Sequence, residues 1–233
     1  MADATEKYYA NERGKTEQYI GFEQKGKLIT FNPKSHVRMF PSFQPEADGV
    51  TFHLKAVYTD TLRNEYSKEH STHPIRMSRI CGPVEVVNDT TFTVRFYRMG
   101  LDNPKRTGGI CLMASVKQDH KYRSAVQQVE IRIPYRNKEG IPQRIIFPKL
   151  SDVKASVKEI SLNGTADSGL PVYYYVKEGP AEIKGDKLVL TKIPPRAKFP
   201  VKVTVVAWQY GRSGEPKVQT AEAVEQSFYI TAR

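Results

Sequence analysis

The sequence is poor in the residues that usually build a catalytic or metal centre. Its 233 residues include two cysteines, five histidines and one tryptophan. No phosphate-binding glycine loop, nucleophile elbow or dinucleotide-binding glycine motif occurs. The closest pair of histidines, His70 and His73, offers too few ligands for a zinc site. We therefore expect no enzyme activity, no metal and no cofactor.

Long apolar runs are also absent. No stretch approaches the roughly 18 apolar residues that a membrane-spanning helix needs, so we expect no membrane span. Disorder of the whole chain is excluded, because hydrophobic residues make up 39% of the sequence and aromatic residues 10%. The first seven residues contain no apolar signal core. This leaves two alternatives: a cytosolic protein, or a mature or partial chain of a secreted one.

Positive charge exceeds negative charge. Lys and Arg number 36 against 25 Asp and Glu, which gives a formal net charge of +11. Such a balance favours an acidic partner, namely nucleic acid, anionic lipid or an acidic polysaccharide, although it also serves solubility alone. The charges are spread without a run of five of one sign, and no aromatic and basic RNA-binding signature occurs. We therefore expect no nucleic-acid partner.

The two cysteines, Cys81 and Cys111, do not decide the cellular compartment. A secreted domain could join them in a disulfide, whereas a cytosolic protein would leave both thiols free. Both alternatives stay open on the sequence alone.

Alternation of apolar and polar residues with period two predicts strands over most of the chain. The clearest segments are rich in Val, Ile, Tyr, Phe and Thr, and Gly, Pro, Asn or Asp turns separate them. They are residues 29–31, 50–54, 92–96, 172–176, 187–190, 201–207 and 228–230. No segment after residue 27 has a sustained helical period. Short strands at this spacing predict an all-β protein built from β-sandwiches.

A weak internal repeat divides the chain into two copies. Gly82 and Gly179, each followed by Pro, are 97 residues apart, and so are Ile133 and Ile230. Leu28 to Pro33 is in turn similar to Arg144 to Pro148. We predict two tandem sandwiches with a short polar linker between them. The predicted boundaries are 1–26 for an N-terminal extension, 27–135 for the first sandwich with an inserted loop near 61–72, 136–142 for the linker, and 143–233 for the second sandwich.

Several stretches of the second copy carry a family resemblance. They are residues 143–147, 162–172, 179–181, 203–209 and 224–228. These stretches resemble the bacterial immunoglobulin-like (Big-type) repeats of large secreted and cell-surface proteins, which often accompany polysaccharide-degrading domains. The resemblance implies an all-β chain of two tandem immunoglobulin-like β-sandwich domains. It also implies a non-catalytic spacer or binding module in a secreted, periplasmic or cell-surface protein of a bacterium. The insertion at 193–200 departs from the family pattern.

Strand parity in the second copy predicts two contrasting faces on one sheet. If segments 172–176, 201–209 and 227–230 are neighbours, alternate residues point inward. The inward set is Val172, Tyr174, Val176, Val203, Val205, Ala207, Phe228 and Ile230. The outward set is Tyr173, Tyr175, Thr204, Val206, Trp208 and Tyr229. Four aromatic rings on a solvent-facing sheet are unusual for a monomer, so we expect this face to bind something.

Two functions fit such an aromatic face. Aromatic rings stack on the C–H face of a sugar, and nearby cations pair with uronate or sulfate groups. We therefore predict an accessory module of a secreted bacterial polysaccharide-processing protein that binds glycan, including anionic polysaccharide. The predicted contact residues are Tyr173, Tyr175, Trp208, Tyr229, Arg196, Lys198 and Lys202. The alternative is a structural spacer or docking domain that positions a catalytic domain of a longer parent chain, with the rings buried against another segment.

Overall fold

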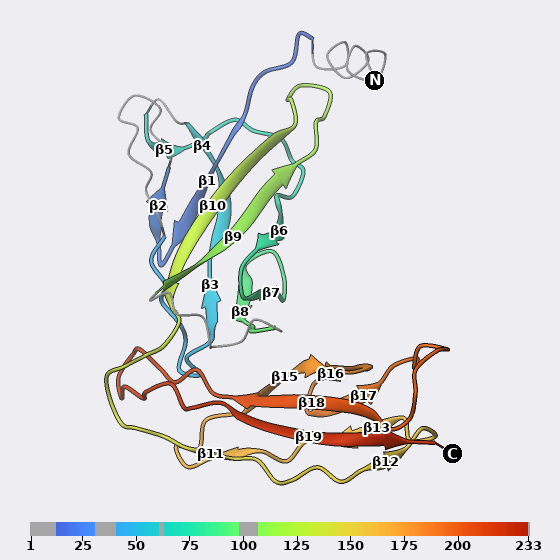
Figure 1. The fold of residues 1–233 in the computed structure, drawn as a ribbon. Coiled ribbons are helices and arrows are strands. Elements are labelled where there is room, and N and C mark those ends of the chain that lie inside the picture. The colour runs from blue at the N-terminus through green and yellow to red at the C-terminus, as the bar shows by residue number, and fades with distance from the viewer. Residues whose placement is uncertain (1–12, 31–40, 61–62, 98–106, 233) are drawn as a thin grey trace. The chain divides into compact units, whose positions relative to one another are not determined.

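The computed structural model describes residues 13–30, 41–60, 63–97 and 107–232. Within these ranges every regular element is a strand, and no helix long and apolar enough to cross a membrane occurs. The chain divides into two compact units (Figure 1). Unit 1 comprises Met1–Gln44, Phe52–Val94 and Gly109–Ile133, and unit 2 comprises Pro45–Thr51, Arg95–Gly108 and Pro134–Arg233.

The described part of unit 1 is built from three sheets, in which β1 pairs antiparallel with β2 and β4, β4 with β5, β6 with β9, and β7 with β8. One has the order β2-β1-β4-β5, the second β10-β9-β6 and the third β3-β8-β7. The strands are β1 (Tyr19–Gln24), β2 (Lys27–Ile29), β3 (Thr51–His53), β4 (Lys55–Asp60), β5 (Glu65–Tyr66), β6 (Arg76–Cys81), β7 (Val84–Val86), β8 (Thr91–Val94), β9 (Thr107–Val116) and β10 (Ala125–Pro134). Fully buried side chains from several of these strands form the core, among them Phe52, Phe92, Leu112 and Ile131.

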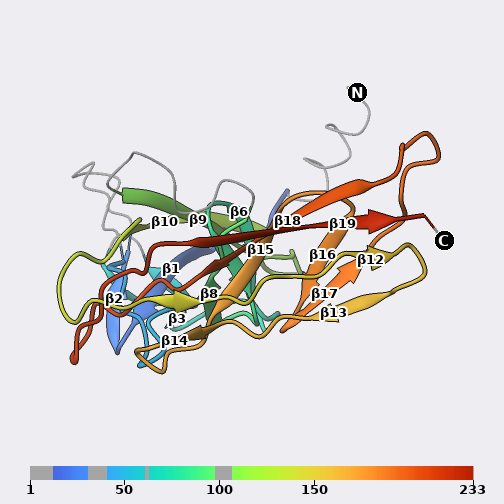
Figure 2. The same cartoon turned by 60° about the horizontal axis from the view of Figure 1, so that its bottom comes forward.

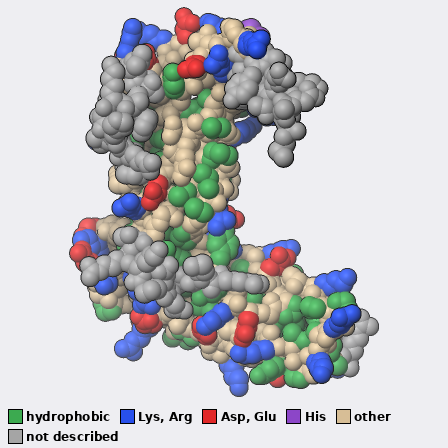
Figure 3. Space-filling view, turned by 45° about the horizontal axis from the view of Figure 1, so that its top comes forward, with side chains coloured by type: hydrophobic (Ala, Val, Ile, Leu, Met, Phe, Trp, Pro, Cys, Tyr) green, Lys and Arg blue, Asp and Glu red, His purple; other side chains and the backbone are tan. Residues whose placement is uncertain are grey.

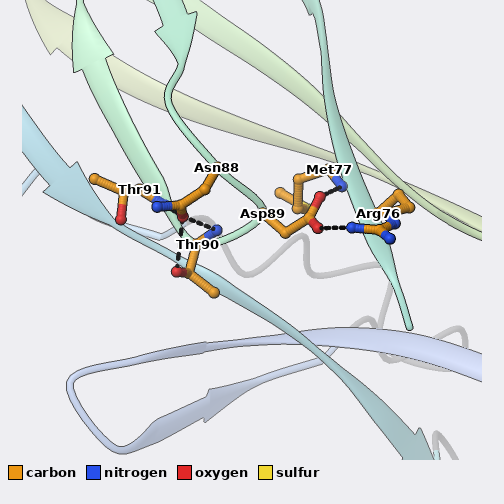
Figure 4. A network of polar contacts seen from close by, with 6 residues as sticks. All are labelled: Arg76, Met77, Asn88, Asp89, Thr90 and Thr91. Carbon is orange, nitrogen blue, oxygen red and sulfur yellow. Dashed lines mark hydrogen bonds and ion pairs between the residues drawn. The ribbon is translucent and has the colours of Figure 1, made fainter.

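A polar turn connects two of these sheets in unit 1 (Figure 4). The turn between β7 and β8 is closed by Asn88, whose Oδ1 accepts hydrogen bonds from the backbone of Thr90 and Thr91 at 2.9 Å. The neighbouring Asp89 accepts a hydrogen bond from the backbone of Met77 at 2.8 Å and one from Arg76 at 2.7 Å. Both donors lie on β6, so the Asp89 carboxylate joins the β3-β8-β7 sheet to the β10-β9-β6 sheet.

The described part of unit 2 has a four-stranded sheet, β12-β19-β18-β15, a three-stranded sheet, β13-β17-β16, and the short pair β11-β14. The strands are β11 (Ile145–Ile146), β12 (Val153–Lys154), β13 (Glu159–Ser161), β14 (Thr165–Ala166), β15 (Tyr173–Glu178), β16 (Ala181–Lys184), β17 (Lys187–Leu190), β18 (Val201–Trp208) and β19 (Val224–Thr231). Strand β12 runs parallel to β19, and the other pairs are antiparallel. Figures 1 and 2 both show β15, β18 and β19 side by side.

Strand parity sets the core of unit 2 as the sequence predicts. All eight residues predicted to point inward belong to the core or pack against it. Leu188 of β17 and Phe147 are among the residues that join this core from outside the three predicted strands. The result is two sheets facing each other across apolar side chains, with the strand order of an immunoglobulin-like sandwich.

The two units repeat one topology, which confirms the predicted all-β tandem sandwich. The order β10-β9-β6 in unit 1 matches β19-β18-β15 in unit 2, and β3-β8-β7 matches β13-β17-β16. Strands β6 and β15 begin and end 97 residues apart. Each of the two carries a register shift near its end, between Arg79 and Cys81 in β6 and between Val176 and Glu178 in β15.

The observed units differ from the predicted boundaries. β1 lies within the predicted extension 1–26, yet it pairs with β2 and β4 and belongs to unit 1. In its described part, the similarity of Leu28 to Pro33 with Arg144 to Pro148 is not a structural equivalence, because β1 rather than β2 pairs with β4 as β11 pairs with β14. Residues 31–33 lie outside the described residues. Residues 1–12 lie outside the described residues.

Two segments of the predicted first sandwich, 45–51 and 95–108, cluster instead with unit 2. The predicted linker 136–142 also belongs to unit 2 and is hydrogen-bonded to it. The backbone of Ile141 donates to Lys217 O at 2.9 Å, and the Asn137 amide donates to Tyr210 O at 2.9 Å. Sequence periodicity does not detect such contacts, because they join positions far apart in the chain.

Candidate functional site

The outer face of the β18 sheet in unit 2 is the candidate site that the sequence predicts. The register places Tyr173 opposite Trp208 and Tyr175 opposite Val206 on the β15 and β18 pair. On the other side of β18, Tyr229 lies opposite Lys202. Directly opposite residues share a face, so the predicted parity of all four aromatic residues is correct.

The predicted exposure of these rings is wrong for two of them. Trp208 is fully buried, with 0% of its surface exposed, and Tyr175 is 5% exposed. Tyr173 is half-buried, and only Tyr229 is well exposed. The aromatic rings therefore do not form one solvent-facing plane, because one end of the outer face of the sheet is covered by other residues of unit 2.

Phe96 is the residue that covers Trp208. It lies in segment 95–108, which the fold assigns to unit 2, and it is itself 3% exposed. Its ring meets Trp208 edge-on at a centroid distance of 5.0 Å, and the Tyr173 ring stacks on Trp208 at 4.9 Å. Such aromatic pairs each contribute about 0.5–1.5 kcal/mol beyond the buried area. Phe96, Tyr173 and Trp208 thus form a second apolar cluster on the side of the sheet away from the main core.

Tyr210 extends this aromatic cluster beyond the end of β18. Its ring lies 5.9 Å from that of Phe96 and is completely buried. The hydroxyl group donates a hydrogen bond to Pro134 O, and burial raises the pKa of Tyr210 far above its usual value. Burial also raises the pKa of Tyr173, with the negative charge of Asp48 as a smaller cause. The phenols of the cluster therefore stay neutral at physiological pH.

Segment 45–51 packs on the same end of unit 2. A Cβ atom on Gly49 would lie 2.0 Å from the carbonyl oxygen of Gly211, and Gly49 has a φ of +78°. Arg212 donates from its guanidinium group to Ala47 O at 3.0 Å. Only glycine allows this approach of two backbones, since any side chain at position 49 would overlap the facing carbonyl.

The indole N–H of Trp208 has no acceptor among the described residues. A buried donor without a partner costs about 1–3 kcal/mol. Burial of the ring offsets this cost, because a large aromatic side chain removes 150–250 Å² or so from water. At position 208 the gain from burial of the apolar ring therefore exceeds the cost of the unpaired indole N–H.

The exposed candidate residues lie at the other end of the sheet. Tyr229 is 42% exposed, and Arg196 and Lys198 are exposed in the segment between β17 and β18. Lys202 is six residues before Trp208 on the same strand, or about 20 Å away at 3.3 Å per residue. The structure thus separates the predicted ligand-binding set into a buried group and an exposed group.

Between these two groups the outer face is polar and internally bonded. Lys202 pairs with Glu178 at 2.7 Å, and the Thr204 hydroxyl also donates to Glu178 at 2.7 Å. These two contacts lower the pKa of the Glu178 carboxyl. Thr204 also contacts Ser227 at 2.8 Å. Lys202 therefore already has an anionic partner within the sheet and is not a free cation for an acidic sugar.

In unit 1, Ser71, His70 and Asp119 combine a hydroxyl, an imidazole and a carboxylate, the side-chain types of a catalytic triad. The Ser71 hydroxyl is the main cause that lowers the pKa of Asp119 to about 2. Ser71 is only 1% exposed, and its Oγ accepts a hydrogen bond from the His73 backbone at 3.1 Å. The His70 ring stacks on Tyr58 at 4.2 Å, and its Nδ1 lies 2.7 Å from Ser71 O. These contacts hold the described part of the inserted loop in place, and the Ser71 hydroxyl is buried.

On the face that Figure 3 draws, charge does not mark a separate binding surface. In Figure 3, Lys and Arg side chains are mixed with Asp and Glu over the face that is drawn. Many basic residues are paired, as Lys177 is with Glu225 at 2.5 Å and Lys187 with Glu159 at 2.7 Å. No group of three or more potential metal ligands occurs among the described residues.

No protein-family model and no curated protein matches the sequence. Among solved structures, human protocadherin-24 EC1-2 matches with a TM-score of 0.31 and 13% identity, over 81% of this chain and 92% of that one. Drosophila N-cadherin EC1-4 matches with a TM-score of 0.29 and 12% identity, over 82% of this chain and 47% of that one. At such low TM-scores the likeness carries no argument about function. The fold assignment rests on the strand order described above.

Sequence reasoning missed Phe96 as part of this site. The residue continues the alternation of the predicted strand 92–96, but β8 ends at Val94 and Phe96 turns to unit 2. An aromatic residue just past a strand end is the available signal, although the sequence does not show which surface it covers.

Proposed function

We propose that this chain is a non-catalytic structural module, a spacer or docking piece of a larger secreted or cell-surface protein. The main support is the burial of Trp208 beneath Phe96, because a sheet face used for packing within the unit is not free to stack on sugar. Two sandwich units of one topology in tandem suit a spacer. The resemblance of residues 143–233 to bacterial immunoglobulin-like repeats supports the same assignment.

Glycan binding stays a second candidate, restricted to the exposed end of the sheet. Tyr229, Arg196 and Lys198 are exposed there. Of the predicted contact set, only one ring and two cations remain exposed there, which would give weak binding, since stacking with several rings and paired charges is what makes such sites selective.

Affinity gel electrophoresis of the full chain through neutral and acidic polysaccharides separates the two functions. The structural module predicts unchanged mobility in every glycan gel relative to a gel without glycan. Retardation that disappears in Tyr229→Ala would support the glycan function and overturn the structural one. Tyr229 is the suitable probe because it is exposed, whereas Trp208→Ala would open the aromatic cluster and confuse binding with stability.

A further inference from the structure

Cys81 and Cys111 lie opposite each other on neighbouring strands of unit 1. β6 and β9 pair antiparallel, and the register places Cys81 directly across from Cys111. Residues opposite each other in such a pair have Cα atoms about 4.5–5.5 Å apart, within the range of about 4.4–6.8 Å that a disulfide spans. Both residues are free thiols in this structure, and the Cys81 thiol is a cause, after burial, of the raised pKa of Cys111.

The corresponding position in unit 2 shows that the backbone there brings two side chains together. Glu178 of β15 is 97 residues after Cys81, follows an equivalent register shift and lies opposite Thr204. These two side chains form a hydrogen bond of 2.7 Å. A glycine with positive φ follows in both units, Gly82 at +96° and Gly179 at +102°. The bulge in unit 2 therefore brings a cross-strand pair of side chains into contact, and the pair at the equivalent bulge of unit 1 is two cysteines.

We propose that Cys81 and Cys111 form a disulfide that fastens edge strand β6 to β9 when the protein meets an oxidising environment. β6 is the outer strand in the order β10-β9-β6, so among the described strands its ladder pairs with β9 alone. A covalent link at the bulge stabilises the place where the register shift interrupts the regular ladder. This inference does not depend on the structural or glycan function proposed for unit 2.

The cross-link requires an oxidant, for which a low-molecular-weight disulfide such as oxidised glutathione suffices. The exposed Cys81 thiolate attacks one sulfur of glutathione disulfide, forms a mixed disulfide and releases one glutathione thiolate. The Cys111 thiolate then attacks the Cys81 sulfur and releases the second glutathione. Two protein thiols lose two protons and two electrons, and one glutathione disulfide is reduced to two thiols. Burial and contact with Cys81 raise the pKa of Cys111, which favours Cys81 as the first nucleophile.

Incubation of the full chain with oxidised glutathione tests the proposal. We expect complete loss of both free thiols, a mass decrease of two hydrogen atoms and one non-reduced peptide that joins Cys81 to Cys111. Cys81→Ser and Cys111→Ser are the matched controls, and each should end as a mixed disulfide with glutathione. Doubly glutathionylated or disulfide-linked dimeric wild type, with no internal link, would overturn the proposal.

Thermal unfolding gives a second measurement. The oxidised chain should show a transition of unit 1 raised by about 10 °C over the reduced chain, measured by calorimetry. The double variant Cys81→Ser, Cys111→Ser should unfold like the reduced wild type and show no response to oxidant. A lower unfolding temperature for the oxidised form would mean that the link strains the bulge, and it would also overturn the proposal.

Discussion

Removal of the Phe96 ring tests the aromatic cluster of unit 2. In Phe96→Ala the cluster loses a side chain that is 3% exposed and contacts both Trp208 and Tyr210. Replacement of a buried Phe by Ala costs about 3–5 kcal/mol, the sum of lost apolar burial and the cavity that remains. This is a large part of the roughly 5–15 kcal/mol that stabilises a typical domain.

Urea unfolding followed by tryptophan fluorescence measures this loss in the right unit. Trp208 is the one tryptophan of the sequence, so its emission reports on unit 2 alone. With a urea slope of about 2 kcal/mol per molar, the midpoint should fall by about 2 M. In the native variant, acrylamide should also quench Trp208 more strongly than in the wild type, because the ring edge is uncovered.

Two control variants make the Phe96 result decisive. Phe96→Leu keeps most of the apolar volume and should cost far less than Phe96→Ala. Tyr229→Ala removes an exposed ring of the same sheet and should change the free energy of unfolding by less than about 0.5 kcal/mol. An unchanged midpoint together with unchanged quenching in Phe96→Ala would refute the reasoning, since Phe96 would then not cover Trp208.

Three further predictions concern other contacts. The pKa of Asp119 is lowered from 3.8 to about 2. The folding stability that its ionised carboxylate contributes is therefore complete above pH 3.8 and is lost as pH falls toward 2. Asp119→Asn should therefore flatten the acid limb of unit 1 stability in far-UV circular dichroism, and an unchanged limb would contradict this. Tyr210→Phe should lower the stability of unit 2 by about 1–2 kcal/mol, because Pro134 O loses its donor; an unaltered urea midpoint would contradict this. Gly49→Ala should lower the free energy of unfolding of unit 2 by at least about 2 kcal/mol in urea, since its Cβ would meet Gly211 O in a backbone with φ of +78°. An unchanged urea midpoint would show that the backbones at Gly49 and Gly211 do not approach each other so closely.

Sequence periodicity predicted the inner face of unit 2 because strand geometry has a fixed period of two. Val203, Val205 and Ala207 alternate along β18 and all enter the core. The tandem repeat can also be predicted from the sequence, because Gly82 and Gly179 both adopt positive φ at the same bulge of each unit and lie at equivalent positions. These features depend on local spacing, which a sequence shows directly.

The exposure of the outer face could not be predicted in the same way. Alternation shows that Trp208 and Val203 point in opposite directions, but it does not show what lies on either side of the sheet. The answer depends on Phe96 and on segment 45–51, which reach unit 2 from more than 100 residues earlier in the chain. A strand that is buried on both faces is apolar on both faces. In the second half of β18 the sequence signal for such burial is Val206, an apolar residue at an outward position, and it is 1% exposed.

The separation of Tyr229 from Trp208 has a similar origin. Both residues occupy the outer face, but antiparallel register places Tyr229 opposite Lys202, at the start of β18, while Trp208 ends that strand. Parity alone gives the face of a residue and says nothing of its position along the sheet, which requires the strand register.

Acrylamide quenching of Trp208 in the native, full-length wild-type chain tests the central claim most directly. A ring enclosed by Phe96 and Tyr173 predicts weak quenching and emission well to the blue of the urea-unfolded chain, unchanged by added polysaccharide. Strong quenching with emission like that of the unfolded chain would mean that the indole faces solvent, and the structural assignment of this sheet face would be wrong.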